Sequence, residues 1–309
     1  MKVVFMGTPS FAVPVLQGLI DNYDVVLVVT QPDKKIGRHQ NLRMSPIKEL
    51  ALEYDISVFQ PEKIRVDYQK ILDSKPDMIV TCAYGQIVPK IILDCPKFGC
   101  INVHASLLPK LRGGAPIHKA IMEGYSSTGI TIMYMDVGMD DGDIISQSEI
   151  PILDSDNLES LHDKLSLLGA KLLLDTIPSI LDGTNERIKQ ISDEVTYAYN
   201  IKREEEHIDF SKTSLEVYNL IRGLSPNPAA NAILFGQEMK ICESRLFSKN
   251  YLNHVCGEIV EVLKEGIVVV TGDGSILLTK VKPFGKKMMD ASSYVNGVGK
   301  DKIIGQVFI

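Results

Sequence analysis

The chain has 309 residues, of which 45% are hydrophobic and 23% charged, and its formal net charge is −6. This length and composition are typical of a globular protein of two domains, and the acidic balance excludes a general nucleic-acid binder with a uniformly basic surface. No apolar run reaches the roughly eighteen residues of a membrane span, and the N-terminus enters a strand-like run without the basic region of a signal peptide. We therefore expect a cytoplasmic protein that does not contact membranes.

Strand-like and helix-like segments alternate through the first third of the chain. Short apolar runs predict strands, and amphipathic segments between them predict helices. Strands that alternate with helices indicate a largely parallel sheet with helices on its faces, as in Rossmann-like α/β domains. The expected strands are 2–7, 25–30, 56–60, 78–83 and 100–105, and the expected helices are 11–22, 46–54 and 66–74.

The turn after the first strand carries one glycine, Gly7, followed by Thr8 and Pro9. Dinucleotide-binding turns use three glycines to bring the backbone close to a pyrophosphate. The missing glycines argue against NAD binding, and Gly7 is more simply explained by a tight turn.

The strand expected at 100–105 ends in a polar pair, Asn102 and His104. Side chains alternate along a strand, so these two share one face. An amide can hold a developing oxyanion and an imidazole can move a proton, which together suggest acyl-group chemistry. A structural reading competes for each residue alone, because a histidine at a strand end and an asparagine at a turn often serve only as hydrogen-bonding groups.

An acid-rich turn, MDVGMDDGD at 135–143, offers a carboxylate that could hold the imidazole in one tautomer. The same turn could be a solvated loop or a calcium loop. Aligning Gly142 with the invariant glycine of a calcium loop puts Met139 and Ser148 where ligands belong, so the calcium template fails and we expect no metal site.

The second half of the chain divides in three. Leucines at helical spacing predict a long core helix at 157–180. Apolar periodicity is then lost in a charged stretch, which we interpret as a linker at 186–205 between domains 1–185 and 206–309. After a short helix at 214–221, brief strand-like runs separated by Gly, Asn and Asp predict a small β domain.

Five cysteines occur at scattered, mostly apolar positions and lack the C-x-x-C spacing of zinc or redox sites. We expect them to be reduced core residues. They are Cys82, Cys95, Cys100, Cys242 and Cys256.

Several long motifs, in order along nearly the whole chain, resemble the signature of the folate-dependent formyltransferases, and most closely those that act on methionyl-tRNA. Their number and order make the resemblance specific. The motifs are VVFMGTPSFAVPVL, TQPDKKIGR, PDMIVTCAYGQIVPK, NVHASLLPKLRGGAP, TGITIMYMDVGMDDGDII and GDGSILLTKVKPFGKKMM.

The resemblance implies a catalytic trio of Asn102, His104 and Asp140, although Asp141 falls where relatives often carry a small or hydroxyl residue, which leaves open which aspartate faces the site. It implies 10-formyltetrahydrofolate as formyl donor, without a metal, and initiator methionyl-tRNA as acceptor, for translation initiation. It also implies an oligonucleotide-binding-like (OB-like) barrel in the C-terminal domain. We expect a monomer. The turn expected to contact the folate consists of Ser106, Leu107, Leu108 and Pro109.

Two local clusters of basic residues offset the acidic balance of the chain. Residues 31–48 carry a local excess of four positive charges, and the segment KVKPFGKK contains no acid. Such runs are often merely solvated faces, but Lys and Arg also bind a nucleic-acid backbone. With the resemblance, in which the first cluster enters the acceptor end of the tRNA, the expected tRNA contacts are Lys34, Lys35, Arg38, Arg43, Lys286 and Lys287.

Two alternatives stay open at this point. The same active site could serve a small amine acceptor, or water in a formyl-folate hydrolase. The chain could also be a non-enzymatic RNA-binding module that retains these residues as a relic.

Overall fold

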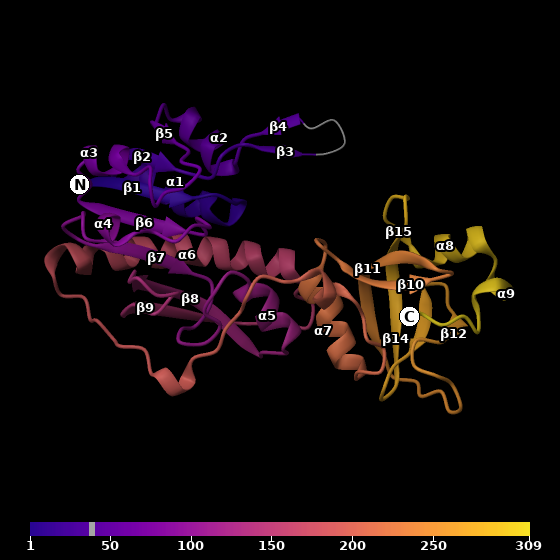
Figure 1. Ribbon diagram of the computed structural model, residues 1–309. Coiled ribbons are helices and arrows are strands. Elements are labelled where there is room, and N and C mark those ends of the chain that lie inside the picture. The colour runs from indigo at the N-terminus through magenta and orange to yellow at the C-terminus, as the bar shows by residue number, and fades with distance from the viewer. Residues whose placement is uncertain (37–40) are drawn as a thin grey trace. The chain divides into compact units, whose positions relative to one another are not determined.

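The structure is a computed structural model that describes residues 1–36 and 41–309 (Figure 1). The chain forms two compact units, each assembled from three segments. The first unit comprises Met1–Pro116, Ser127–Pro151 and His162–Tyr199, and the second comprises Ile117–Ser126, Ile152–Leu161 and Asn200–Ile309. Most of the stretch interpreted as a linker therefore packs within the first unit, up to Tyr199.

The first unit is built on one sheet with strand order β5-β2-β1-β6-β7-β8-β9. The first five of these strands run parallel, as expected, while β8 and β9 are antiparallel additions that the sequence pattern did not predict. The strand bounds are β1 Lys2–Gly7, β2 Asp24–Val29, β5 Val58–Phe59, β6 Met78–Cys82, β7 Cys100–His104, β8 Ser127–Tyr134 and β9 Ile144–Pro151.

Helices cover both faces of this sheet. On one face, Gly18 of α1 contacts Leu174 of α6, and Gly169 of α6 contacts Val103 of β7. On the other, α3 and α4 pack against alternate residues of β1 and β2 in a buried cluster that includes Ile71 and Ile92. The bounds are α1 Val13–Asn22, α2 Pro46–Glu53, α3 Gln69–Asp73, α4 Lys90–Leu93 and α6 Leu158–Asp182.

Local sequence sets the beginning of α2 but not that of α3. Pro46 begins α2, and the hydroxyl of Ser45 caps it by accepting from the backbone N–H of Lys48 at 3.1 Å. The helix expected at 66–74 is shorter than its pattern suggested and begins only at Gln69.

A two-stranded hairpin, β3 (Lys34–Ile36) with β4 (Asn41–Arg43), follows β2 along the chain. The carboxylate of Asp33 at its base accepts from Lys48 Nζ at 2.6 Å and from Gln60 Nε2 at 2.7 Å. These bonds lower the pKa of Asp33. Lys48, counted among the local positive charges, is therefore neutralised by an ion pair.

The second unit is an antiparallel β domain, as the sequence predicted, with strand order β10-β11-β14-β13-β12 and β15 paired to β14. Helix α7 packs on β11 and β14, and α8 and α9 follow β15. The bounds are α5 Pro116–Met122, α7 Ser214–Leu224, β10 Ala230–Leu234, β11 Gln237–Phe247, β12 Ile259–Val262, β13 Ile267–Val270, β14 Ser275–Pro283, β15 Met289–Asp290, α8 Ala291–Val298 and α9 Lys300–Ile303.

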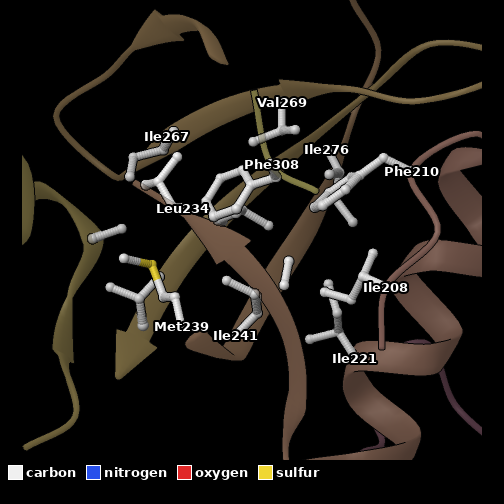
Figure 2. Close-up of a cluster of buried hydrophobic side chains, with 14 of the residues drawn as sticks. Ile208, Phe210, Ile221, Leu234, Met239, Ile241, Ile267, Val269, Ile276 and Phe308 are labelled. Atoms are coloured by element: carbon white, nitrogen blue, oxygen red, sulfur yellow. The ribbon is translucent and has the colours of Figure 1, made fainter. Parts of the chain in front are cut away.

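The last residues of the chain join the two edge strands of this sheet. Ile309 exchanges two backbone hydrogen bonds with Ile233 of β10, and the N–H of Phe308 donates to the carbonyl of Gly257, just before β12. The ring of Phe308, 3% exposed, stacks on Phe210 and enters the core shown in Figure 2. This C-terminal segment thus closes the sheet on itself around one hydrophobic core.

All five cysteines are free. Cys82, Cys100 and Cys242 are buried, as expected, and burial raises the pKa of the Cys82 thiol. Cys95 is only half-buried and Cys256 is exposed, so the expectation of a core position is wrong for Cys256. None of the helices formed by residues 1–36 and 41–309 is long and apolar enough to cross a bilayer.

Candidate active site

Asn102 and His104 lie at the carboxyl end of β7 and share one face of the sheet. Cys100, in phase with them, belongs to the buried cluster on the α3 and α4 face, whereas Val103 packs on α6 on the opposite face. Strand alternation therefore brings the amide and the imidazole to the same side, as the sequence indicated.

The amide of Asn102 is oriented by groups at both of its ends. Its Oδ1 accepts from the hydroxyl of Thr81, on the neighbouring strand, at 2.8 Å. Its Nδ2 lies 3.4 Å from Oδ1 of Asp140, which can only accept. The N–H₂ end therefore faces the carboxylate, and one of its two hydrogens stays available to a ligand.

The ring of His104 is 6% exposed and lies between two acceptors. Its Nε2 is 3.1 Å from the carbonyl oxygen of Leu111, and its Nδ1 is 3.7 Å from Oδ2 of Asp140. A carbonyl cannot donate, so Nε2 carries a hydrogen. In the neutral ring, Nδ1 then presents a lone pair toward the carboxylate. Only the charged ring can donate in both directions.

Asp140 is the acidic residue of the 135–143 turn that joins this group. Its Oδ2 accepts from the backbone N–H of Gly113 at 2.8 Å, and its side chain is 19% exposed. Its backbone has φ +48°, in the left-handed region that costs a non-glycine residue on the order of 1–2 kcal/mol. Asp141 is exposed, and its carboxylate lies against Gly138. The structure thus brings Asn102, His104 and Asp140 together and leaves Asp141 outside.

Gln190 holds the backbone of the Asp140 turn. Its Nε2 donates to the carbonyl oxygens of Asp140 and Gly142, both at 2.8 Å. Its Oε1 accepts from Nε and Nη2 of Arg112 at 3.0 and 2.8 Å. Gln190 therefore ties two segments of the site to each other.

The sequence pattern did not single out Gln190, because a glutamine in a charged, aperiodic stretch carries no local signal. Gly113, by contrast, does carry a local sequence signal. It follows Arg112 in the run Arg-Gly-Gly, it has φ +120°, and a Cβ there would lie 2.7 Å from the carbonyl oxygen of Ala198. A glycine pair beside catalytic candidates is a usable signal of close backbone approach.

The turn expected to contact folate is held mainly by its own polar groups. Ser106 is fully buried and its hydroxyl donates to the carbonyl of Lys110 at 2.7 Å. The N–H of Leu108 donates to the hydroxyl of Thr131 at 3.1 Å, and its side chain packs with Met133 and Ile144. Leu107 and Pro109 are half-buried, so they are the members of this turn with surface open to a ligand.

The expected tRNA contacts that the structure describes fall on two strands and one turn, all exposed. Lys34, Lys35 and Arg43 are exposed on the β3–β4 hairpin, where Lys34 and Arg43 pair directly across the strands. Arg38 lies outside the described residues. Lys286 and Lys287 are exposed in the turn between β14 and β15. Like charges directly opposite each other destabilise a strand pair, so β3 and β4 are suited to an anionic partner.

Comparison with known proteins gives consistent matches to one family. Residues 1–177 match the formyl transferase family and residues 200–299 match the formyl transferase C-terminal domain. Methionyl-tRNA formyltransferase of Bacillus subtilis is 53% identical over 300 residues, covering 96% of this chain and 94% of that protein. The protein of the same name from Geobacillus sp. is 50% identical over 309 residues, covering 99% and 97%.

Among solved structures, an N-formyltransferase from Helicobacter canadensis in complex with folinic acid and dTDP-3-aminofucose superposes with a TM-score of 0.70. It is 23% identical and covers 92% of this chain and 100% of that chain, so it supports the shared fold. Since the family match covers more than half of the sequence and the two bacterial relatives are about half identical over nearly all of it, this chain belongs to the formyl transferase family.

Proposed function

We propose that this protein transfers the formyl group of 10-formyltetrahydrofolate to the free amino group of initiator methionyl-tRNA, making N-formylmethionyl-tRNA for translation initiation. The observation that carries the proposal is the carboxylate of Asp140 held between the amide of Asn102 and the imidazole of His104. The choice of acceptor is supported by the relatives of about half identical sequence, which are named for it.

The three side chains supply the groups that formyl transfer needs. In the proposed mechanism the methionyl nitrogen attacks the formyl carbon, and negative charge develops on the formyl oxygen. We assign the stabilisation of that charge to Asn102 Nδ2 and to Nδ1 of the charged His104 ring, since Nε2 of His104 is engaged with Leu111. Asp140 accepts the proton that the amine loses. The bond between the formyl carbon and the folate nitrogen then breaks, and the folate leaves with that proton on its nitrogen.

The donor set fits a formyl-bearing folate as co-substrate. It combines an amide donor, an imidazole and a carboxylate with no need for a Lewis acid, and 10-formyltetrahydrofolate supplies the carbon at the oxidation level of formate. Leu107 and Pro109 offer partly open apolar surface beside this group, and Ser106 and Leu108 shape the turn that carries them.

The acceptor would be held by the two basic clusters. Lys34, Lys35 and Arg43, with Arg38, are proposed to contact the acceptor end, and Lys286 and Lys287 the outside of the stem. Phosphate contacts of this kind position an RNA without reading its sequence. We assign catalysis to residues 1–185, the connection to 186–205 and a contribution to tRNA binding to 206–309, in a cytoplasmic monomer. The part of the connection up to Tyr199 packs within the first unit and supports the catalytic group through Gln190.

The test is to incubate the protein with 10-formyltetrahydrofolate and methionine-charged initiator tRNA, and to measure formyl-methionine after mild deacylation. We expect formylation of charged tRNA and none in a control with uncharged tRNA. Formylation of a nucleotide-linked amino sugar instead would favour the small-acceptor alternative. Formate release without an acceptor would indicate a hydrolase. RNA binding with no turnover of the folate would indicate a non-enzymatic RNA-binding module.

A further inference from the structure

Two exposed tyrosines form a parallel stack in the segment that follows Gln190. The rings of Tyr197 and Tyr199 lie 5.4 Å apart, centroid to centroid, with 3° between their planes. The residues are 48% and 57% exposed. Alternation along an extended segment puts them on one side of it, because one residue, Ala198, separates them.

The backbone of this segment is paired with the residues that hold the active site. The N–H of Arg112 donates to the carbonyl of Thr196 at 2.9 Å, and the N–H of Ala198 donates back to the carbonyl of Arg112 at 2.7 Å. The hydroxyl of Thr196 also accepts from the N–H of Leu111 at 2.9 Å. The stacked tyrosines therefore extend from a short parallel pairing of Tyr197 with Arg112.

Leu111 and Arg112 each have a direct link to the catalytic group. Leu111 supplies the carbonyl that binds His104, and Arg112 binds Gln190, which holds the backbone of Asp140. Gly113, whose N–H binds Asp140, also packs on the carbonyl of Ala198, between the two tyrosines. Gly113 is thus the link between the Asp140 carboxylate and the backbone of Ala198, the residue between the two tyrosines.

The exposure of the two tyrosines indicates that they contribute little to the stability of the fold. Both rings leave about half of their surface in water, whereas Ala198 between them is completely buried. Exposed aromatic faces on a rigid backbone suit the stacking of nucleobases, which tolerates any base because every base has a π-face. The unpaired 3′ end of an acceptor tRNA presents such bases close to the aminoacyl ester.

We propose that Tyr197 and Tyr199 form a stacking platform for the 3′-terminal nucleobase of the acceptor tRNA, whose ribose carries the methionyl ester. The inference rests on the proposed function, since it takes a charged tRNA as the acceptor. By fixing that base, the platform limits the positions that the amino group can reach beside Asn102 and Asp140. The platform is a positioning device and takes no part in proton transfer.

The experiment is a double-mutant cycle between protein and RNA. The full-length protein is titrated into a 5′-labelled acceptor-stem hairpin that ends in single-stranded CCA, and into the same RNA with an abasic 3′-terminal nucleotide. The variants are Tyr197→Ala with Tyr199→Ala, the corresponding double Phe variant, and Tyr54→Ala. Tyr54 is a matched control because it is 47% exposed in the same unit, on the turn after α2.

The double Ala variant is expected to lose roughly five- to a hundredfold in affinity for the intact RNA, the range typical of one stacked base. The abasic RNA should bind the wild-type protein and the double Ala variant equally, because it lacks the base that stacks on the tyrosines. The double Phe variant keeps the ring faces and should bind the intact RNA within about twofold of wild type, as should Tyr54→Ala. Thermal unfolding midpoints of all variants, compared with wild type, verify that the fold is retained.

An equal loss of affinity for intact and abasic RNA would overturn the platform, as would an unchanged affinity of the double Ala variant or no binding of the RNA by the wild-type protein. The cycle uses uncharged RNA and needs no formyl transfer. Coupling without formylation would therefore leave the platform standing while the proposed function fails. Formylation without coupling would leave the proposed function standing and overturn the platform.

Discussion

Asp140 and Asp141 are adjacent in sequence but lie in different environments. Asp140 has a left-handed backbone, accepts from Gly113 and lies next to His104, whereas Asp141 is exposed. The sequence alone left the choice between them open. It is decided by backbone direction, because the left-handed φ at Asp140 turns its side chain toward β7.

Replacing Asp140 by Asn tests its charge while preserving its shape. Asparagine tolerates the left-handed conformation and can still accept from Gly113 through its amide oxygen. It cannot take a proton from the attacking amine, so we expect kcat to fall on the order of a hundredfold or more. Steady-state kinetics with charged tRNA measure this. Asp141→Asn is the matched control and should keep kcat within about twofold, so similar losses in both variants would reject the assignment.

Gln190 offers a second test at the same scale, because it both donates and accepts. Gln190→Glu can still accept from Arg112 but cannot donate to the carbonyls of Asp140 and Gly142. We expect kcat to fall about tenfold in this variant through misplacement of the carboxylate. The KM for tRNA and the melting temperature should change little. A loss confined to melting temperature would show that Gln190 serves only stability.

At the scale of elements, the C-terminal segment is the one that completes the second unit. Ile309 and Phe308 bond to opposite edges of the sheet, and the Phe308 ring fills the core between Phe210 and its neighbours (Figure 2). An open sheet would leave the backbone groups of both edges unpaired, so these few residues replace an edge strand.

Phe308→Ala should therefore destabilise the second unit by about 3–5 kcal/mol, the usual cost of truncating a buried phenylalanine. Urea unfolding followed by circular dichroism measures the change. Ile309→Ala is the control, because Ile309 is 75% exposed and makes its bonds to Ile233 through the backbone, which the substitution retains. Its effect should stay within about 0.5 kcal/mol. Equal effects of the two variants would mean that the ring does not support the closure.

Period and composition predicted the elements that carry an apolar run or an apolar helical stripe, and missed those that depend on distant partners. The parallel strands through β7 and the long helix α6 follow from apolar runs and from leucines at helical spacing. Alternation alone placed Asn102 and His104 together. The β3–β4 hairpin is short and charged, and Gln190 acts through contacts with residues about fifty and eighty positions away in sequence. Local patterns carry no information about such contacts.

At the scale of the whole molecule, the net charge is negative, but positive charge gathers at a few local positions. The chain carries −6 overall, yet the turn between β14 and β15 exposes Lys286 and Lys287 beside Phe284, which is 71% exposed. Two other lysines of the second unit are opposed by acids, Lys249 by Glu261 and Lys280 by Glu243. An acidic protein that binds tRNA must do so through turns whose charge is not neutralised within the chain.

Salt dependence separates these two kinds of lysine. Each phosphate contact adds about 0.9 to the slope of the logarithm of affinity against the logarithm of salt concentration, because binding releases counterions. Replacing Lys286 and Lys287 by Ala should weaken tRNA binding and reduce the magnitude of that slope by about two, measured by filter binding between about 50 and 200 mM salt. Replacing Lys249 and Lys280 by Ala removes the same formal charge from the same unit, but from lysines already engaged in ion pairs. We expect that variant to keep the wild-type slope. If both variants change the slope equally, the affinity follows net charge and the turn holds no phosphate of its own.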